Sequence, residues 1–200
     1  MAGLISDIFL KTFDYIKSSL KTSQAKRNAI FDKNSRVFSE GKVINLQETK
    51  SSIKIGKFAR IRGEILCFPH GGNIAVGDWF YIGPNSLIWS SDKKGIIIGD
   101  RVLVSSDVSI FDNNSHPLDK EERFKQTQEI FNKGHPKNIK TIESAPIIIE
   151  DDVWICRGAT IMKGIHIGKG AIIGTNAIIL SDVSDGSIIL PGVIHKKDLN

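Results

Sequence analysis

The chain has 200 residues with a formal net charge of +5, and 40% of its residues are hydrophobic while 24% are charged. This is the size and composition of one ordinary domain with at most a small appendage. Two distant cysteines, Cys67 and Cys156, exclude a disulfide framework and a paired zinc knuckle, which favours a reducing cytoplasm. Basic residues are scattered and aromatic residues few, so we expect no nucleic-acid partner; the mild positive charge suits an anionic small molecule or glycan.

The N-terminal segment, residues 1–30, predicts a helix with one apolar face and lysines on the opposite side. Asp7 and Lys11 interrupt its apolar stretch, unlike a signal peptide, and no run is long enough to span a membrane. We expect the apolar face to pack on the rest of the protein as a cap, and contact with a membrane surface is the alternative. The face consists of Leu4, Ile5, Ile8, Phe9, Phe13, Ile16 and Leu20.

A six-residue period dominates the chain from position 149 onward. Isoleucine recurs at every sixth position, and a small or aliphatic residue follows each isoleucine by four positions. A helix needs a period near 3.6, and the intervening Gly, Asp and Asn residues would break long strands, so a coil with three short flat faces fits better. The isoleucines are Ile149, Ile155, Ile161, Ile167, Ile173 and Ile179, and the small residues are Val153, Ala159, Ile165, Ala171, Ala177 and Val183.

The first half of the chain repeats the same phase in three shorter runs, separated by insertions at Phe68–Ala75 and Trp89–Ile97. Stacked coils of this kind form a parallel β-helix, an all-β fold. We therefore expect a capping segment at 1–50, a β-helix at 51–192 with a loop insertion at 112–146, and a tail at 193–200. The inward positions of the three runs are Ile55, Ile61 and Cys67, then Val76, Ile82 and Ile88, then Ile98, Val104 and Ile110.

The period lapses in the loop insertion at 112–146. A loop of this length in a compact domain is usually functional or disordered. It holds His116, which Pro117 biases toward extended backbone, and His135. A histidine at the exit of a loop is suited to act as a general base near neutral pH, although a solvated turn residue is the alternative.

Several segments resemble the hexapeptide-repeat acyltransferases, and within them the polysaccharide and sugar O-acetyltransferase branch. They include SIFDNNSHPLDKEER at 109–123, GHPKNI at 134–139 and IIIEDDVWICRGATIMKGIHIGKGAIIGTNAIIL at 147–180. The resemblance covers about residues 50 to 192. It implies a left-handed β-helix, acetyl-CoA as the acyl donor, a homotrimer and His116 as the base that deprotonates the acceptor.

The resemblance also implies further site residues. Trp154 would wall the acyl-transfer site, and Asn85 would bind the acceptor, although the alignment there is two residues off. The family's coenzyme A contacts fall at Arg157, Thr175 and Ser181. Its 3′-phosphate contacts would be Lys196 or Lys197, in a tail, PGVIHKKDLN, that departs from the family's usual ending.

Position alone makes Asp112, Asn114 and Asp119 candidates to hold the acceptor sugar or to orient His116. The oxyanion of the tetrahedral intermediate needs a donor. A backbone N–H near Ser115–Pro117, at Trp154 or at Gly158 would serve. We expect no metal, because the five histidines lack the spacing of the zinc carbonic anhydrases that share this fold.

These features together favour a cytoplasmic O-acetyltransferase that acts on a sugar hydroxyl of a bacterial surface polysaccharide, such as capsule or lipopolysaccharide, or of its precursor. Contact of the N-terminal helix with the membrane surface would place the protein at the periphery of the inner membrane. N-acetylation of a nucleotide-linked amino sugar uses the same donor and the same base. A non-catalytic β-helix scaffold that binds a partner protein is the third possibility.

Overall fold

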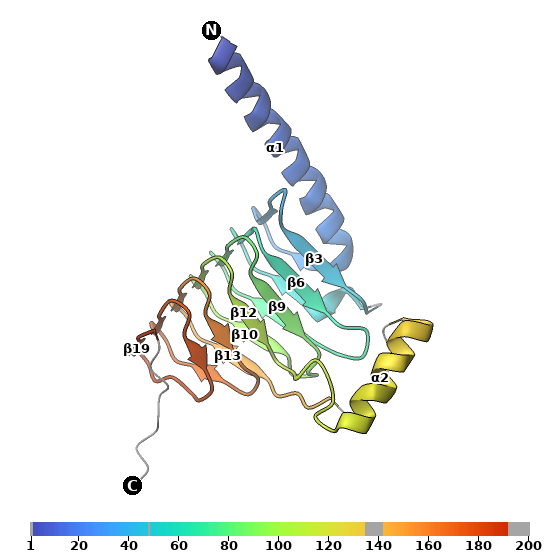
Figure 1. The fold of residues 1–200 in the computed structure, drawn as a ribbon. Coiled ribbons are helices and arrows are strands. Elements are labelled where there is room, and N and C mark those ends of the chain that lie inside the picture. The colour runs from blue at the N-terminus through green and yellow to red at the C-terminus, as the bar shows by residue number, and fades with distance from the viewer. Residues whose placement is uncertain (1, 48, 135–141, 192–200) are drawn as a thin grey trace.

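The computed structural model describes residues 2–47, 49–134 and 142–191, with the side chains of residues 2–9 and 11 left out. Its strands are short and form three parallel sheets, each of which takes one strand from every coil (Figure 1). A coil passes through sheet A, then sheet B, then sheet C, and the next coil pairs with it in parallel register. This is the parallel β-helix that the six-residue period predicts.

The element bounds follow the three sheets. Sheet A contains β1 (Ile30–Phe31), β4 (Ile53–Ile55), β7 (Ile74–Val76), β10 (Ile96–Ile98), β13 (Ile147–Ile149) and β16 (His166–Ile167). Sheet B contains β2 (Arg36–Val37), β5 (Arg60–Ile61), β8 (Tyr81–Ile82), β11 (Leu103–Val104), β14 (Trp154–Ile155), β17 (Ile172–Ile173) and β19 (Ile188–Ile189). Sheet C contains β3 (Lys42–Asn45), β6 (Glu64–Cys67), β9 (Leu87–Ser90), β12 (Ser109–Phe111), β15 (Thr160–Ile161) and β18 (Ile178–Ile179). The helices are α1 (Ala2–Asn28), the short 3-10 helix η1 (Lys50–Ser52) and α2 (Lys120–Lys133).

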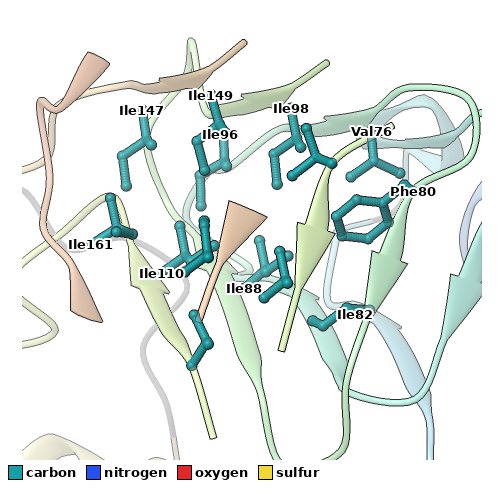
Figure 2. Packing of buried hydrophobic residues seen from close by; sticks show 14 of the residues in the cluster. Val76, Phe80, Ile82, Ile88, Ile96, Ile98, Ile110, Ile147, Ile149 and Ile161 are labelled. Atoms are coloured by element: carbon teal, nitrogen blue, oxygen red, sulfur yellow. The ribbon is translucent and has the colours of Figure 1, made fainter. Parts of the chain in front are cut away.

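The core is the inside of the triangular coil, filled by one inward side chain per face. All the isoleucines and small residues predicted to point inward are buried, at most 7% exposed. Figure 2 shows Ile88, Ile110 and Ile161 from sheet C opposite Ile98 and Ile149 from sheet A. Each inward side chain packs on an isoleucine or valine of the next coil in most of the stack, because the parallel register places inward position on inward position.

The corners between sheet A and sheet B have a fixed form. At each of them four residues separate the two strands, from residues 32–35 in the first coil to 168–171 in the sixth, and the third of the four has a positive φ. Four of the B–C corners have the same form, with Asn85, Asp107, Gly158 and Asn176 at that position. Asn and Gly are the residues that tolerate this conformation best, as predicted, but Phe58 and Trp79 also adopt it and stack with ring centroids 4.4 Å apart.

The coils begin earlier than the sequence pattern indicates. Strands β1, β2 and β3 pair with β4, β5 and β6, so residues 30–45 form a complete first coil within the segment expected to be a cap. Residues 1–30 were expected to be helical, and α1 is a helix that lies against β2 and β3 at this end of the stack (Figure 1).

The contact face of α1 differs from the expected one. Its C-terminal half packs through Ser18, Thr22 and Ala25, and the Ser18 hydroxyl donates to the Val37 carbonyl at 2.7 Å. On a helix with 100° per residue, Ile16 and Leu20 lie opposite these residues, and they are 51% and 66% exposed. The prediction that this apolar face packs on the same chain is therefore wrong for these side chains.

Candidate active site

The third corner, between sheet C and sheet A of the next coil, carries the insertions. They occupy residues 46–52, 68–73, 91–95 and 112–146, one above another along the stack. The longest is closed at its base, because Asn113 pairs with Ser144 in an antiparallel bridge and the Ala145 N–H donates to the Asp112 carbonyl at 2.9 Å. The segment where the six-residue period lapses is thus a loop that leaves the coil at one edge, and backbone hydrogen bonds hold its two ends together.

Asp112 is a buried anchor for this corner. It is 0% exposed, and its carboxylate accepts from the Ser90 hydroxyl, from the Ser91 N–H at 2.8 Å, from the Asp92 N–H at 3.2 Å and from the Asn113 amide at 3.0 Å. Burial raises the pKa of Asp112, although these hydrogen bonds oppose the rise. Both oxygens are used inside the chain, so the structure does not support the predicted contact of Asp112 with an acceptor sugar.

The anchor is linked to His116 through a short turn. The Asn113 side chain, held by Asp112, accepts from the Ser115 N–H at 2.8 Å. Ser115 has a φ of 60°, and the His116 N–H donates to the Asn114 carbonyl at 2.6 Å. The position of the histidine is therefore set by side-chain hydrogen bonds that begin at a buried carboxylate.

The loop continues into α2, which the sequence did not predict. Asp119 caps this helix by accepting from the N–H groups of Glu121 and Glu122, and no hydrogen bond between Asp119 and His116 is found among the described residues. Two turns into the helix, the Oε1 atom of Gln126 lies 2.8 Å from Nδ1 of His116. His116 itself is exposed, whereas Gln126 is 7% exposed. Gln126 was missed because the contact spans ten residues and depends on where α2 begins.

The other predicted groups of the loop are already paired within the chain. The Asn114 amide lies 3.3 Å from the Glu143 carboxylate, and its N–H donates to the Glu143 carbonyl. The backbone N–H groups suggested for the oxyanion all have acceptors: Ser115 donates to Asn113, His116 to Asn114, Trp154 to Ala171 and Gly158 to Ser106. Pro117 has no N–H, so none of these backbone groups is available to an oxyanion in this structure.

Two predicted donor-binding residues, Arg157 and Thr175, lie on a different edge from His116, and so does Asn85, which was predicted to bind the acceptor. Asn85, Asp107 and Arg157 occupy successive B–C corners, where Asp107 accepts from Asn85 at 3.2 Å and from Arg157 at 2.9 Å. These hydrogen bonds lower the pKa of the Asp107 carboxyl, and the one from Asn85 has the largest effect. Thr175 lies at the next B–C corner of the stack, so Arg157 and Thr175 are one coil apart along this edge, and Asn85 is two coils from Arg157.

The remaining predicted residues are dispersed. Trp154 is 46% exposed on the outer face of sheet B, between Leu103 and Ile172 of the neighbouring coils. Ser181 is exposed after β18, at the C–A edge. Lys196 and Lys197, as well as His135, lie outside the described residues. One chain therefore does not bring His116 together with Asn85, Arg157 and Thr175.

A surface pocket of about 480 Å³ opens at the C–A corner. It lies between two insertions, with Asp92, Lys93 and Lys94 on one side and Ser144 and Pro146 on the other. The Ser144 hydroxyl donates to Asp92 at 2.8 Å, which fixes the two insertions to each other.

Two absences hold for the part of the chain that the structure describes. No three His, Cys, Asp or Glu side chains converge in a group able to hold a metal ion. None of the described helices combines the length and the apolar character needed to cross a membrane.

Comparisons with known proteins agree with this architecture. Residues 146–181 match the family model for the bacterial transferase hexapeptide (six repeats). A candidate acetyltransferase of Saccharomyces cerevisiae, YJL218W, is 29% identical over 120 residues, which are 60% of this chain and 52% of the yeast protein. The chain thus spans about half the length of this curated relative.

Two solved structures share the fold. AntD, an N-acyltransferase from Bacillus cereus solved with dTDP-4-amino-4,6-dideoxyglucose and coenzyme A, has a TM-score of 0.62 at 14% identity, over 84% of this chain and 82% of AntD. A galactoside acetyltransferase in complex with coenzyme A has a TM-score of 0.50 at 20% identity, over 84% and 64% of the two chains. The predicted fold class, a left-handed parallel β-helix, and the resemblance to hexapeptide-repeat transferases are confirmed.

Proposed function

We propose that this hexapeptide-repeat protein is an acyltransferase that moves acetyl from acetyl-CoA to a hydroxyl of a bacterial surface-polysaccharide sugar or its precursor. The observation that carries the proposal is the setting of His116. Its Nδ1 contacts a side-chain oxygen, the residue is exposed, and no hydrogen bond to Nε2 is found among the described residues. An exposed imidazole with one nitrogen held and the other open is arranged to act as a base.

The reaction needs one proton transfer and no covalent enzyme intermediate. The acceptor hydroxyl would attack the thioester carbonyl while Nε2 of His116 removes its proton. The tetrahedral intermediate would then expel the thiolate of coenzyme A, which takes the proton back from the imidazolium. The products are the acetyl ester and free coenzyme A, and the histidine returns to its neutral form.

We further propose that the active unit is a homotrimer. The predicted donor-binding residues on the B–C edge and His116 on the C–A edge lie on different edges of one triangular prism. A second copy placed with its B–C edge against this C–A edge would complete the site, and a closed threefold ring satisfies every copy in the same way. The exposed Trp154 and Leu103, on the outer face of sheet B, are apolar surface that such contacts would cover.

The acceptor would occupy the pocket between the two insertions at the C–A corner. Asp92, Lys93 and Lys94 line it and carry hydrogen-bond acceptors and donors, which are the groups that pair with sugar hydroxyls. Acceptor choice then depends on the insertion at 91–95 and on the loop 112–146, which are the least periodic parts of the sequence.

N-acylation of a nucleotide-linked amino sugar is the second candidate function. It is favoured by the fold shared with AntD, which is named as an N-acyltransferase and was solved with such a sugar. The two reactions differ in the product, because an ester is released by hydroxylamine or mild alkali and an amide is not.

The location that fits this activity is the cytoplasm, where acetyl-CoA is made, with α1 at the inner membrane surface. Leu10, Ile16 and Leu20 of α1 are each more than half exposed, while its packed residues face the coils. Lys17 and Lys21 flank the exposed side, an arrangement typical of helices that lie on anionic lipid.

The experiment compares acetyl-CoA turnover by the full chain and its His116→Ala variant over a panel of acceptor glycans. We expect a loss on the order of 10²–10⁴-fold in kcat, the usual contribution of a general base. His166→Ala is the matched control, because His166 is also exposed but pairs with Glu150 on sheet A. Retention of more than about a tenth of the activity by His116→Ala would exclude His116 as the base.

A further inference from the structure

We infer that Gln126 is a positioning residue that fixes the tautomer of His116, and this inference rests on the proposed function of His116 as a base. The contact joins Oε1 of Gln126 to Nδ1 of His116 at 2.8 Å. A side-chain amide oxygen accepts hydrogen bonds and cannot donate, so Nδ1 carries the proton. A neutral imidazole with its proton on Nδ1 has its lone pair on Nε2, which is the atom that must receive the acceptor's proton.

The burial pattern of α2 singles out the same residue. Gln126 is the buried residue of α2, while Phe124 and Phe131 on the same helix are 59% and 85% exposed. A helix docked by the hydrophobic effect would bury phenylalanine before glutamine. The buried side chain by which α2 meets the loop is therefore a polar one, in contact with His116.

The beginning of α2 holds the two partners at a fixed separation. Asp119 caps the helix, and Nη1 of Arg123 donates to the carbonyls of Pro117 and Leu118, both at 3.0 Å. These bonds fix the link between His116 and the first turn of the helix. Gln126 then reaches back to the imidazole from the second turn, on a rigid element instead of a flexible loop.

The role of His116 as a base also explains why its partner at position 126 is a glutamine and not a glutamate. An amide oxygen orients the imidazole and specifies its tautomer without adding negative charge. A glutamate at this position would also accept from Nδ1, but its charge would favour the imidazolium form, which cannot act as a base. The two residue types thus differ in the pH at which His116 becomes active, and not in geometry.

Three variants of the full chain test the assignment. In Gln126→Leu, we expect kcat to fall about tenfold with KM for acetyl-CoA changed less than about twofold, since part of the base contribution is lost and the donor site is untouched. In Gln126→Glu, we expect activity to persist at high pH, with the acidic limb of the pH–rate profile moved up by about one unit or more. Gln128→Leu, an exposed position on the same helix, is the control and should leave both unchanged.

Nitrogen-15 NMR of the histidine rings gives a readout that does not depend on turnover. In the unmodified chain above the titration of His116, its spectrum should show the proton on Nδ1, and Gln126→Leu should shift the ring toward the Nε2–H form. If no acceptor is acetylated but this spectrum is observed, the proposed function fails and the positioning role stands. A proton on Nε2 in the unmodified chain, or a Gln126→Leu variant with unchanged spectrum and unchanged pH profile, would overturn the inference.

Discussion

Replacement of Asp112 by alanine should weaken both the fold and the site, because its buried carboxylate joins the insertions at 91–95 and 112–146. Four donors lose their acceptor: the Ser90 hydroxyl, the N–H groups of Ser91 and Asp92, and the Asn113 amide. Of these, the donors of Ser90, Ser91 and Asn113 belong to buried residues. Water cannot readily replace the lost acceptor at these three.

The magnitude follows from opposing effects. Each orphaned buried donor costs about 1–3 kcal/mol, so three of them cost at least about 3 kcal/mol. Removal of the carboxylate also relieves the cost of burying it, which is what raises its pKa. We therefore expect a net loss of about 3 kcal/mol, which in a chain of this size lowers Tm by roughly 6–12 °C.

Thermal unfolding followed by circular dichroism measures this loss. Asp112→Asn should lose less, because it keeps one acceptor oxygen, and Asp14→Ala, at an exposed aspartate of helix α1, should change little. Well below Tm, Asp112→Ala should also lower kcat, since Asn113 no longer holds the turn before His116. A fall in Tm of less than about 3 °C in Asp112→Ala would refute the anchoring role.

Further predictions concern titration, thiol reactivity and the N-terminal helix. Because burial raises the folded pKa of Asp112 above its ordinary value of 3.8, its contribution to stability is full below that value and is lost as pH rises through the raised pKa. The Tm advantage of the unmodified chain over Asp112→Asn should therefore shrink between pH 4 and pH 8, and a constant difference would contradict the assignment. Burial, with the nearby charge of Asp112, raises the pKa of the Cys67 thiol to about 12, so a thiol reagent at pH 8 should label the partly exposed Cys156 in the native protein and reach Cys67 only in denaturant. Leu20→Glu should reduce co-sedimentation with vesicles that contain anionic lipid, while Lys33→Ala, on a coil corner, should not; no binding by the unmodified chain would rule out the membrane contact.

The coils could be predicted because their geometry is local. A residue six positions along returns to the same face of the next coil, so the buried rows of isoleucine are visible in the sequence. The two-residue alternation of β-strands also predicts that two polar side chains lie inside the coil, which the six-residue period does not indicate. Ser90 and Asp112 lie two residues after the inward Ile88 and Ile110, which places both inside, in line with Cys67.

The helices were harder to predict, because their placement depends on contacts distant in sequence. The apolar face of α1 is evident from its spacing, but hydrophobicity does not say what covers a face, and the coils bind its small polar side through the Val37 carbonyl. Helix α2 has little apolar periodicity, and its capping residue, Asp119, was predicted to hold the acceptor sugar or to orient His116. Gln126 could be assigned only once the start of that helix was known.

The A–B corners and the C–A corner differ in how well they accept added residues. At the A–B corners a single added residue would move the left-handed position out of place and rotate every later inward side chain. The C–A corner already accepts insertions from 5 residues, at 91–95, to 35 residues, at 112–146, without disturbing the register of the sheets around them. Since the entropy of closing a loop grows only slowly with its length, segments can be exchanged at this edge at little cost in stability. Under the proposed placement of the acceptor, loop grafting at the C–A corner would change the acceptor while the B–C edge stays unaltered.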